Sequence, residues 1–170
     1  MSSTVLLYVE DSSFLKNLSG SLKCLKASVV TAESKHEALE VCSSNREVDL
    51  VLLDIRQQGN DAMQVLARLK KNQPETEVIL LSDSQNITFA MEGMRRGASD
   101  DITVPFDIHL FRKKIKSALR RRKAHLAASR KRTLLNVFED TMMPATFAEA
   151  GEFETAQNIY KGDGGKENVG

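Results

Sequence analysis

Four aliphatic residues in a row, Leu50 to Leu53, are followed directly by a carboxylate, Asp54. A run without polar alternation predicts a strand that is buried on both faces, as in a parallel sheet covered by helices on each side. In open sheets of this kind, ligands bind just beyond the carboxyl ends of the strands. Asp54 is therefore expected at the edge of the sheet that carries the chemistry, although many strand-end aspartates only begin a turn or cap a helix.

Further short apolar segments recur along the chain, and each is followed by apolar residues at helical spacing. This β-α alternation occurs five times and predicts a doubly wound α/β fold with a parallel sheet and right-handed crossovers. Ser12 and Ser13 are expected to cap the first helix, Gly97 to end the fourth and Asp107 to cap the fifth. The expected strands are residues 5–9, 28–32, 50–53, 78–81 and 101–104, and the intervening helices include residues 34–43, 62–69 and 85–95.

The chain of 170 residues can hold one ordinary domain and an appendage. Helical character is expected to continue to about Phe138, because no Gly or Pro occurs between Pro105 and Pro144. We therefore expect a domain and a helical C-terminal extension followed by a tail with a short helix and a disordered end. The expected boundaries are 1–122 for the domain, 123–140 for the basic extension and 141–170 for the tail.

Charge is distributed unevenly along the chain. Residues 112–132 contain eleven Lys or Arg and no acid, whereas the rest has thirteen basic and twenty-three acidic residues. Clustered cations could bind nucleic acid, but neither a helix-turn-helix nor interleaved aromatic residues accompany them. A solvated helix is the favoured interpretation, and it could dock on an acidic partner or pair with its copy in a homodimer. A weak seven-residue seam for such pairing consists of Leu119, Leu126, Thr133 and Val137.

Cys24 and Cys42 are the only cysteines and are widely spaced, so neither a metal-binding set nor a redox pair is available. Both are expected as buried thiols. No apolar run approaches the length of a membrane span, and Val5 to Val9 is too short for an export signal. We therefore expect a cytoplasmic protein that does not contact a membrane.

Acidic and hydroxyl residues follow three of the expected strands. Glu10 and Asp11 come after the first strand, Asp54 after the third and Ser82 after the fourth. If these strand ends converge, three carboxylates share a small volume beside a hydroxyl. Like charges placed in this way raise one another's proton affinity unless a cation relieves them. Carboxylate oxygens and backbone carbonyls are ligands that suit Mg²⁺.

Residues 4 to about 122 resemble the receiver domain of bacterial response regulators, the CheY-like family. The resemblance rests on the joint order and spacing of several features, because each of them alone would be weak. It implies a flavodoxin-like five-stranded sheet in the order 2-1-3-4-5. The matching features are Glu10-Asp11, Asp54, Ser82, and Gly97-Ala98-Ser99-Asp100 leading to Pro105-Phe106-Asp107.

The same resemblance implies roles for individual residues. A histidine kinase or phosphotransfer protein would donate a phosphoryl group to Asp54, and the hydroxyl of Ser82 would bind the new oxygens. Mg²⁺ would be held by Asp11, Asp54 and the backbone carbonyl of Arg56, with Glu10 acting through a metal-bound water.

Three positions of the switch region depart from the family pattern. Val104 stands in place of a Lys whose charge-assisted bond to phosphate is worth roughly 1.5 to 3 kcal/mol. Asp83 replaces a small residue and would repel a phosphoryl group unless it points to solvent. Asp101 replaces an aromatic residue that turns inward on activation. Arg56 could reach the site and partly replace the missing Lys, but a solvent-exposed Arg is the favoured interpretation.

The sequence thus predicts a response regulator that works in a two-component phosphorelay through a downstream protein partner. It is not expected to be an enzyme with a small-molecule substrate, because it would assist only its own phosphorylation and dephosphorylation. One alternative is a pseudo-receiver scaffold that works without phosphorylation. Another is a phosphatase of the HAD type, but Asp54-Ile55-Arg56 lacks the second Asp of the DxD pair that such enzymes use.

Overall fold

The computed structural model describes residues 2–44 and 46–162. Its centre is a five-stranded parallel sheet with the order β2-β1-β3-β4-β5, which confirms the predicted doubly wound α/β fold. The elements are β1 (Thr4–Tyr8), α1 (Ser12–Leu22), the 3₁₀ helix η1 (Lys23–Leu25), β2 (Ser28–Ala32), α2 (Lys35–Ser43), β3 (Leu50–Asp54), α3 (Gly59–Asn72), β4 (Glu77–Ser82), α4 (Ile87–Arg95), β5 (Asp100–Thr103) and α5 (Ile108–Gly162).

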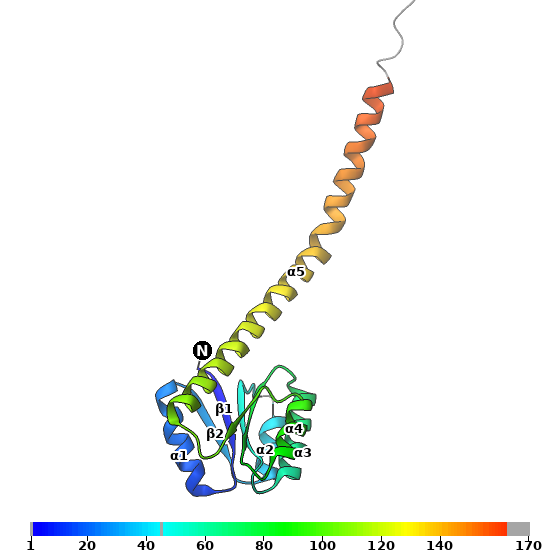
Figure 1. The fold of residues 1–170 in the computed structure, drawn as a ribbon. Helices are drawn as coiled ribbons and strands as arrows, with labels where there is room; N and C mark the ends of the chain where they lie inside the picture. Colours follow the sequence, from blue (N-terminus) through cyan, green and yellow to red (C-terminus); the bar gives the residue numbers. More distant parts are fainter. Residues whose placement is uncertain (1, 45, 163–170) are drawn as a thin grey trace, which may run out of the picture. The chain divides into compact units, whose positions relative to one another are not determined.

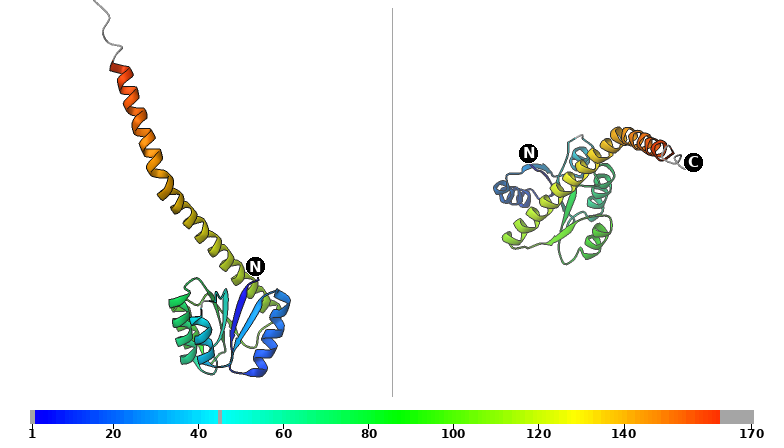
Figure 2. Two further views of the ribbon diagram at one scale, coloured as in Figure 1. Left: turned by 180° about the vertical axis from the view of Figure 1, so that it is seen from behind. Right: turned by 90° about the horizontal axis from the view of Figure 1, so that it is seen from above.

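Helices cover both faces of the sheet (Figure 1), and a view from above shows the same layers (Figure 2). Leu50 and Leu52 of β3 belong to the core beneath α1 and the first turns of α5, whereas Val51 and Leu53 belong to the core beneath α2 and α3. Successive strand residues point to opposite faces, and all four are at most 1% exposed. Burial on both faces explains why this run has no polar alternation.

The parallel register brings the carboxyl ends of the central strands to one edge of the sheet. Tyr8 of β1 pairs with Leu53 of β3, and Asp54 pairs with Leu81 of β4. The backbone N–H of Ile55 donates to the carbonyl of Leu81 at 3.0 Å, so the ladder extends one residue beyond β3. The residues that follow β1, β3 and β4 therefore lie at a common edge.

The N-cap of α1 differs from the prediction. Asp11, and not Ser12 or Ser13, is the cap, and its Oδ1 accepts hydrogen bonds from the backbone N–H of Ser13 at 2.9 Å and of Phe14 at 3.0 Å. A carboxylate satisfies two of the free N–H groups at a helix start and also interacts favourably with the helix dipole. The helix consequently begins at Ser12, two residues earlier than a Ser13 cap would allow.

The caps around β5 agree with the prediction. Gly97 follows α4 with a φ of 102°, a conformation that glycine adopts without the steric cost of a Cβ atom. Asp107 precedes α5, and its Oδ1 accepts from the backbone N–H of His109 at 2.8 Å and of Leu110 at 3.0 Å.

The two cysteines have different environments. Cys42 is 1% exposed on α2, as predicted, whereas Cys24 is exposed and the prediction of a buried thiol is wrong for it. The apolar face of α1 ends at Leu22, and the chain then enters η1, which contains no buried residue. Cys24 thus lies in η1, after the last buried residue of α1.

Part of the basic segment has a structural role. Arg121 Nη2 lies 2.9 Å from Glu77 Oε2 at the start of β4, and Arg122 Nε lies 3.6 Å from Asp49 Oδ1, just before β3. The side chain of Arg122 is only 7% exposed. The favoured interpretation of a solvated helix is therefore wrong for Arg122, because this residue is buried against the amino edge of the sheet.

The chain divides into two compact units, one ending at His125 and one beginning at Leu126. The second unit contains the rest of α5, so the described part of the predicted tail is helical. Disorder was predicted from Lys161 onward; this is wrong for Lys161 and Gly162, which end α5, and residues 163–170 lie outside the described residues. Among the described residues, no helix is long and apolar enough to pass through a membrane.

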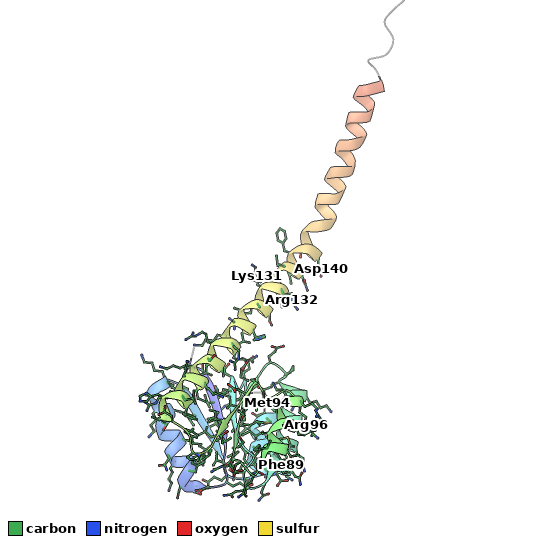
Figure 3. The ribbon with its side chains drawn as sticks, viewed as in Figure 1. Phe89, Met94, Arg96, Lys131, Arg132 and Asp140 are labelled. Carbon is green, nitrogen blue, oxygen red and sulfur yellow. The ribbon has the colours of Figure 1, made fainter. Side chains whose placement is uncertain are left out.

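In the second unit, residues 131–138 expose both charged and large apolar side chains. Thr133 and Val137 of the predicted seam are exposed, and the homodimer stays a prediction. Lys131, Arg132 and Asp140 are exposed on the same helix (Figure 3). The large apolar side chains that are exposed here are Leu134, Leu135, Val137 and Phe138.

Candidate functional site

Asp54 is the last residue of β3, and its side chain is only 6% exposed. The neighbouring Leu53 and Ile55 are buried in the core, which fixes the backbone on both sides of the carboxylate. A buried carboxylate is costly unless hydrogen bonds or an opposite charge compensate for its lost hydration. The partners of Asp54 therefore determine what this site can do.

The guanidinium of Arg56 holds both carboxylate oxygens of Asp54. Arg56 Nε donates to Oδ1 at 2.9 Å, Nη2 donates to Oδ2 at 2.7 Å, and the Arg56 backbone N–H also donates to Oδ1 at 3.0 Å. The Arg56 side chain is 19% exposed. The favoured interpretation of a solvent-exposed Arg56 is thus wrong, because the turn after β3 returns this side chain to the acid two residues before it.

Further contacts hold Arg56 in place. Its guanidinium carbon lies 4.3 Å from the centre of the Phe14 ring, an arrangement that favours a cation. The side-chain hydrogen bond with Asp54 raises the pKa of Arg56 against the opposing effect of burial, and the charges of Asp54, Asp11 and Asp83 add to the increase. Arg56 is therefore fully charged and has acidic groups around it.

Glu10 and Asp11 follow β1 but have other partners. Glu10 Oε1 accepts from the Tyr8 hydroxyl at 3.0 Å, and Oε2 accepts from Gln58 Nε2 at 2.9 Å. Burial, together with the hydrogen bond and charge of Glu10, raises the pKa of Tyr8 well above its usual range. Asp11 Oδ1 caps α1. Both carboxylates are thus used in the local structure of the strand end.

The backbone carbonyl of Arg56 also has a partner, because it accepts from Asn86 Nδ2 at 3.1 Å. Nothing in the sequence pattern marked Asn86 or Gln58 as part of this site. Their roles depend on contacts between distant segments, since Gln58 binds Glu10 after β1 and Asn86 at the start of α4 binds the turn after β3.

The donor chemistry at this edge fits a hard divalent cation, since carboxylates and a carbonyl are the ligands that Mg²⁺ prefers. Within the described residues, however, no three His, Cys, Asp or Glu side chains are arranged to hold a metal ion. Both oxygens of Asp54 are bound by Arg56, and Glu10 and Asp11 have the partners described above. The predicted Mg²⁺ ligand set stays a prediction.

Ser82 ends β4 and is 4% exposed. It follows Leu81, the residue paired with Asp54, so it lies next to the acid on the adjoining strand. Ser82 and Thr103 also line a cavity of about 570 Å³ with apolar residues of α4, including Met94. Met94 is labelled in Figure 3. Ser82 therefore belongs both to the strand beside Asp54 and to the lining of this cavity.

The side chain of Val104 packs against the core beneath α1 and α5, and its backbone N–H donates to the Ser82 carbonyl at 2.8 Å. Residue 104 therefore supplies no charge to the site. Asp83 folds back on its own loop, where Oδ1 accepts from Asn86 Nδ2 at 2.8 Å and from the backbone N–H of Gln85 at 2.9 Å. The hydrogen bond from Asn86 is the main reason that the pKa of Asp83 lies below its usual value.

Asp101 lies on β5 and lines the same cavity as Ser82. Lys114 Nζ donates to the Asp101 carbonyl at 2.5 Å and to Asp100 Oδ1 at 2.8 Å, which fastens α5 to this strand. Lys114 is therefore already engaged at the strand itself.

Comparison with known proteins agrees with this arrangement. Residues 5–116 match the family model described as the response regulator receiver domain. The transcriptional regulatory protein GlrR of Escherichia coli is 40% identical over 104 residues, which cover 61% of this chain and 23% of that protein. A cyclic di-GMP phosphodiesterase of Thermotoga maritima is 29% identical over 121 residues, 71% of this chain and 32% of that protein.

The chain thus spans less than a third of the length of either relative. Among solved structures, the receiver domain of NtrX from Brucella abortus is similar with a TM-score of 0.62 and 29% identity. The match covers 69% of this chain and 98% of that one. With the sheet order, the strand-end acids and a family match over most of its length, this chain belongs to the response regulator receiver domain family.

Proposed function

We propose that Asp54 accepts a phosphoryl group in a two-component phosphorelay, from a histidine kinase or phosphotransfer protein, and that the output is an interaction with a downstream protein. The position of Asp54 supports this proposal, because it is a nearly buried carboxylate at the carboxyl end of the central strand of a receiver fold. Members of the family interact with histidine kinases and downstream effectors. Which partners this chain uses is part of the proposal.

In the proposed reaction, one carboxylate oxygen of Asp54 attacks the phosphorus in line with the donor nitrogen. An O–P bond forms while the P–N bond to the donor histidine breaks, and the imidazole nitrogen keeps the electron pair. Arg56 must release at least one oxygen of Asp54 for this attack. The Ser82 hydroxyl, on the adjoining strand, would then donate a hydrogen bond to an oxygen of the new aspartyl phosphate.

Receiver domains of this family generally bind Mg²⁺ at the phosphorylation site. In this chain, Asp11, Asp54 and the backbone carbonyl of Arg56 would hold the ion, and Glu10 would act through a bound water. When bound, Mg²⁺ neutralises charge on the transferring phosphoryl group. Because Asn86 and Arg56 now occupy two of these ligand atoms, both side chains would have to move.

A pseudo-receiver scaffold is the second candidate. Two observations favour it: Asp54 is already neutralised by Arg56, and Val104 offers no positive charge to a phosphoryl group. In that case the surface would recognise its partner without modification of Asp54. An enzymatic role on a small molecule is not part of either proposal, although one relative is a phosphodiesterase.

Intact-mass measurement separates the two candidates. The parent protein is incubated with acetyl phosphate and Mg²⁺, together with Asp54→Asn and with Asp61→Asn as a control at another acid. A gain of about 80 daltons, one phosphoryl group, is expected in the parent and Asp61→Asn and not in Asp54→Asn. The absence of any gain in the parent would instead support the scaffold.

A further inference from the structure

We propose that the guanidinium of Arg56 is a built-in cation that competes with a divalent metal ion for the carboxylate of Asp54. The receiver site would then be closed by an internal ion pair, and metal binding would require that this pair be broken. The inference rests on the proposed Mg²⁺ site and adds a means of regulating it. It concerns metal affinity only and does not depend on whether Asp54 is later phosphorylated.

The first argument is the geometry of the pair. Three hydrogen bonds of 2.7 to 3.0 Å join Arg56 to Asp54, and they use both oxygens. A planar guanidinium matches a carboxylate with two parallel bonds, which is the strongest form of such contact. A carboxylate has about four acceptor positions, and Arg56 uses three of them on both oxygens, so an incoming ion has to compete with the guanidinium for this group.

The second argument is that Arg56 is held at both ends. The Phe14 ring supports the guanidinium at 4.3 Å, and Asn86 Nδ2 binds the Arg56 carbonyl at 3.1 Å. That carbonyl is itself a proposed metal ligand. Two proposed ligand groups are therefore already engaged, the carboxylate of Asp54 by the Arg56 side chain and the Arg56 carbonyl by Asn86.

The third argument is the charge balance at this edge of the sheet. Arg56 is the one cation that forms an ion pair with Asp54 in the described part of the chain. Lys35, which follows β2, is engaged elsewhere, since it pairs with Asp61. Removal of Arg56 would therefore leave Asp54 without its positive partner and raise the attraction of the site for Mg²⁺.

The test is a calorimetric titration of the full chain with Mg²⁺. Arg56→Met keeps an apolar side chain against Phe14 but removes the charge. Arg56→Lys keeps the charge but cannot make two parallel hydrogen bonds to the carboxylate. Arg96→Ala is the matched control, because Arg96 carries the same charge and pairs with Glu92 on α4. We expect Arg56→Met to tighten the Mg²⁺ dissociation constant roughly ten- to hundredfold. Arg56→Lys should tighten it less, and Arg96→Ala should leave it within about twofold.

Asp54→Asn combined with Arg56→Met should cancel the gain in affinity, which locates the effect at Asp54. Equal Mg²⁺ affinity in the parent, Arg56→Met and Arg56→Lys would overturn the competition while leaving the metal site in place. If none of these proteins binds Mg²⁺, the metal site and the competition both fail. The mass measurement described above is unaffected by either outcome for the competition, so the two proposals are judged separately. If Arg56→Met does not fold, Arg56→Lys carries the comparison.

Discussion

Arg122 of α5 is buried beside Asp49, with Nε 3.6 Å from Oδ1, at the edge of the sheet opposite Asp54. The other oxygen of Asp49, Oδ2, accepts from the backbone N–H of Thr4 at 2.8 Å. One carboxylate therefore connects the start of β1, the entry to β3 and the helix that covers them. Nε of Arg122 has no hydrogen-bond partner among the described residues, so Asp49 is its main electrostatic compensation.

Substitution of Asp49 and of Arg122 should lower the free energy of unfolding by different amounts. Asp49→Ala should lower the free energy of unfolding by about 3 to 5 kcal/mol, because it leaves Arg122 as an uncompensated buried charge. Arg122→Met should cost clearly less, since an apolar side chain of similar length fills the site without needing a partner. Urea denaturation followed by circular dichroism measures both. A larger loss for Arg122→Met than for Asp49→Ala would contradict this account.

Replacement of two helical glycines by alanine should change the stability of the protein in opposite directions. At Gly93 of α4, an added Cβ would lie 2.5 Å from Leu80 Cδ1, and Leu80 is fully buried in the core. We expect Gly93→Ala to cost about 1 to 3 kcal/mol through overpacking. At Gly20 of α1, nothing lies within 4 Å of the added atom, so Gly20→Ala should stabilise by roughly 0.5 to 1 kcal/mol. The same denaturation experiment compares the two variants.

The cysteines should differ in reactivity. Burial raises the pKa of the Cys42 thiol from 9.0 to about 11, whereas Cys24 is exposed. At pH 8, iodoacetamide should modify the folded protein once, and Cys24→Ser should remain unmodified.

Because the pKa of Cys42 is raised in the folded state, its contribution to stability is complete below pH 9 and is lost as the pH rises toward 11. A Cys42→Ala variant should lack this alkaline loss, and modification of Cys42 before Cys24 would refute the prediction.

Acid should weaken the start of α5. Hydrogen bonds from the backbone N–H groups of Leu110 and His109 hold the pKa of Asp107 below its usual value. The stabilising effect of this cap is therefore present above the ordinary pKa near 3.8 and is lost as the pH falls through the lower folded-state value. Asp107→Asn keeps a capping side chain without this titration, so its stability should fall less steeply between pH 4 and pH 2. Asp140→Asn, at an exposed position, should follow the parent.

Most of the fold was accessible from the sequence because strand burial leaves a clear signal. Leu50 to Leu53 are apolar without interruption since both faces of β3 are covered, and Asp107 precedes α5 where a cap is needed. Predicted boundaries in residues 4–107 were within a few residues of the observed ones, whereas the last helix, expected to continue to about Phe138 and to be followed by a short helix, is one helix to Gly162. The burial of Cys24 was predicted wrongly because the spacing of apolar residues indicates that a helix has an apolar face but does not indicate the residue at which that face ends.

The candidate site was less accessible because its contacts depend on side-chain conformation. The order of Glu10, Asp54 and Ser82 along the chain was enough to place them at one edge of the sheet. It could not reveal that Arg56 would turn back onto Asp54, since a charged residue after a strand is more often solvated. Nor could it reveal that Asn86 would bind the carbonyl of Arg56, a contact between residues that are thirty positions apart.

The ion pairs of Arg121 and Arg122 affect how the chain can be shortened. The family match ends at residue 116, yet the cations that neutralise Glu77 and Asp49 come from the next turns of α5. A fragment cut at the end of the match would expose two acids at the amino edge of the sheet and lose the helical turns that cover them. The shortest fragment that keeps the melting temperature of the first compact unit should therefore extend at least to His125, where that unit ends.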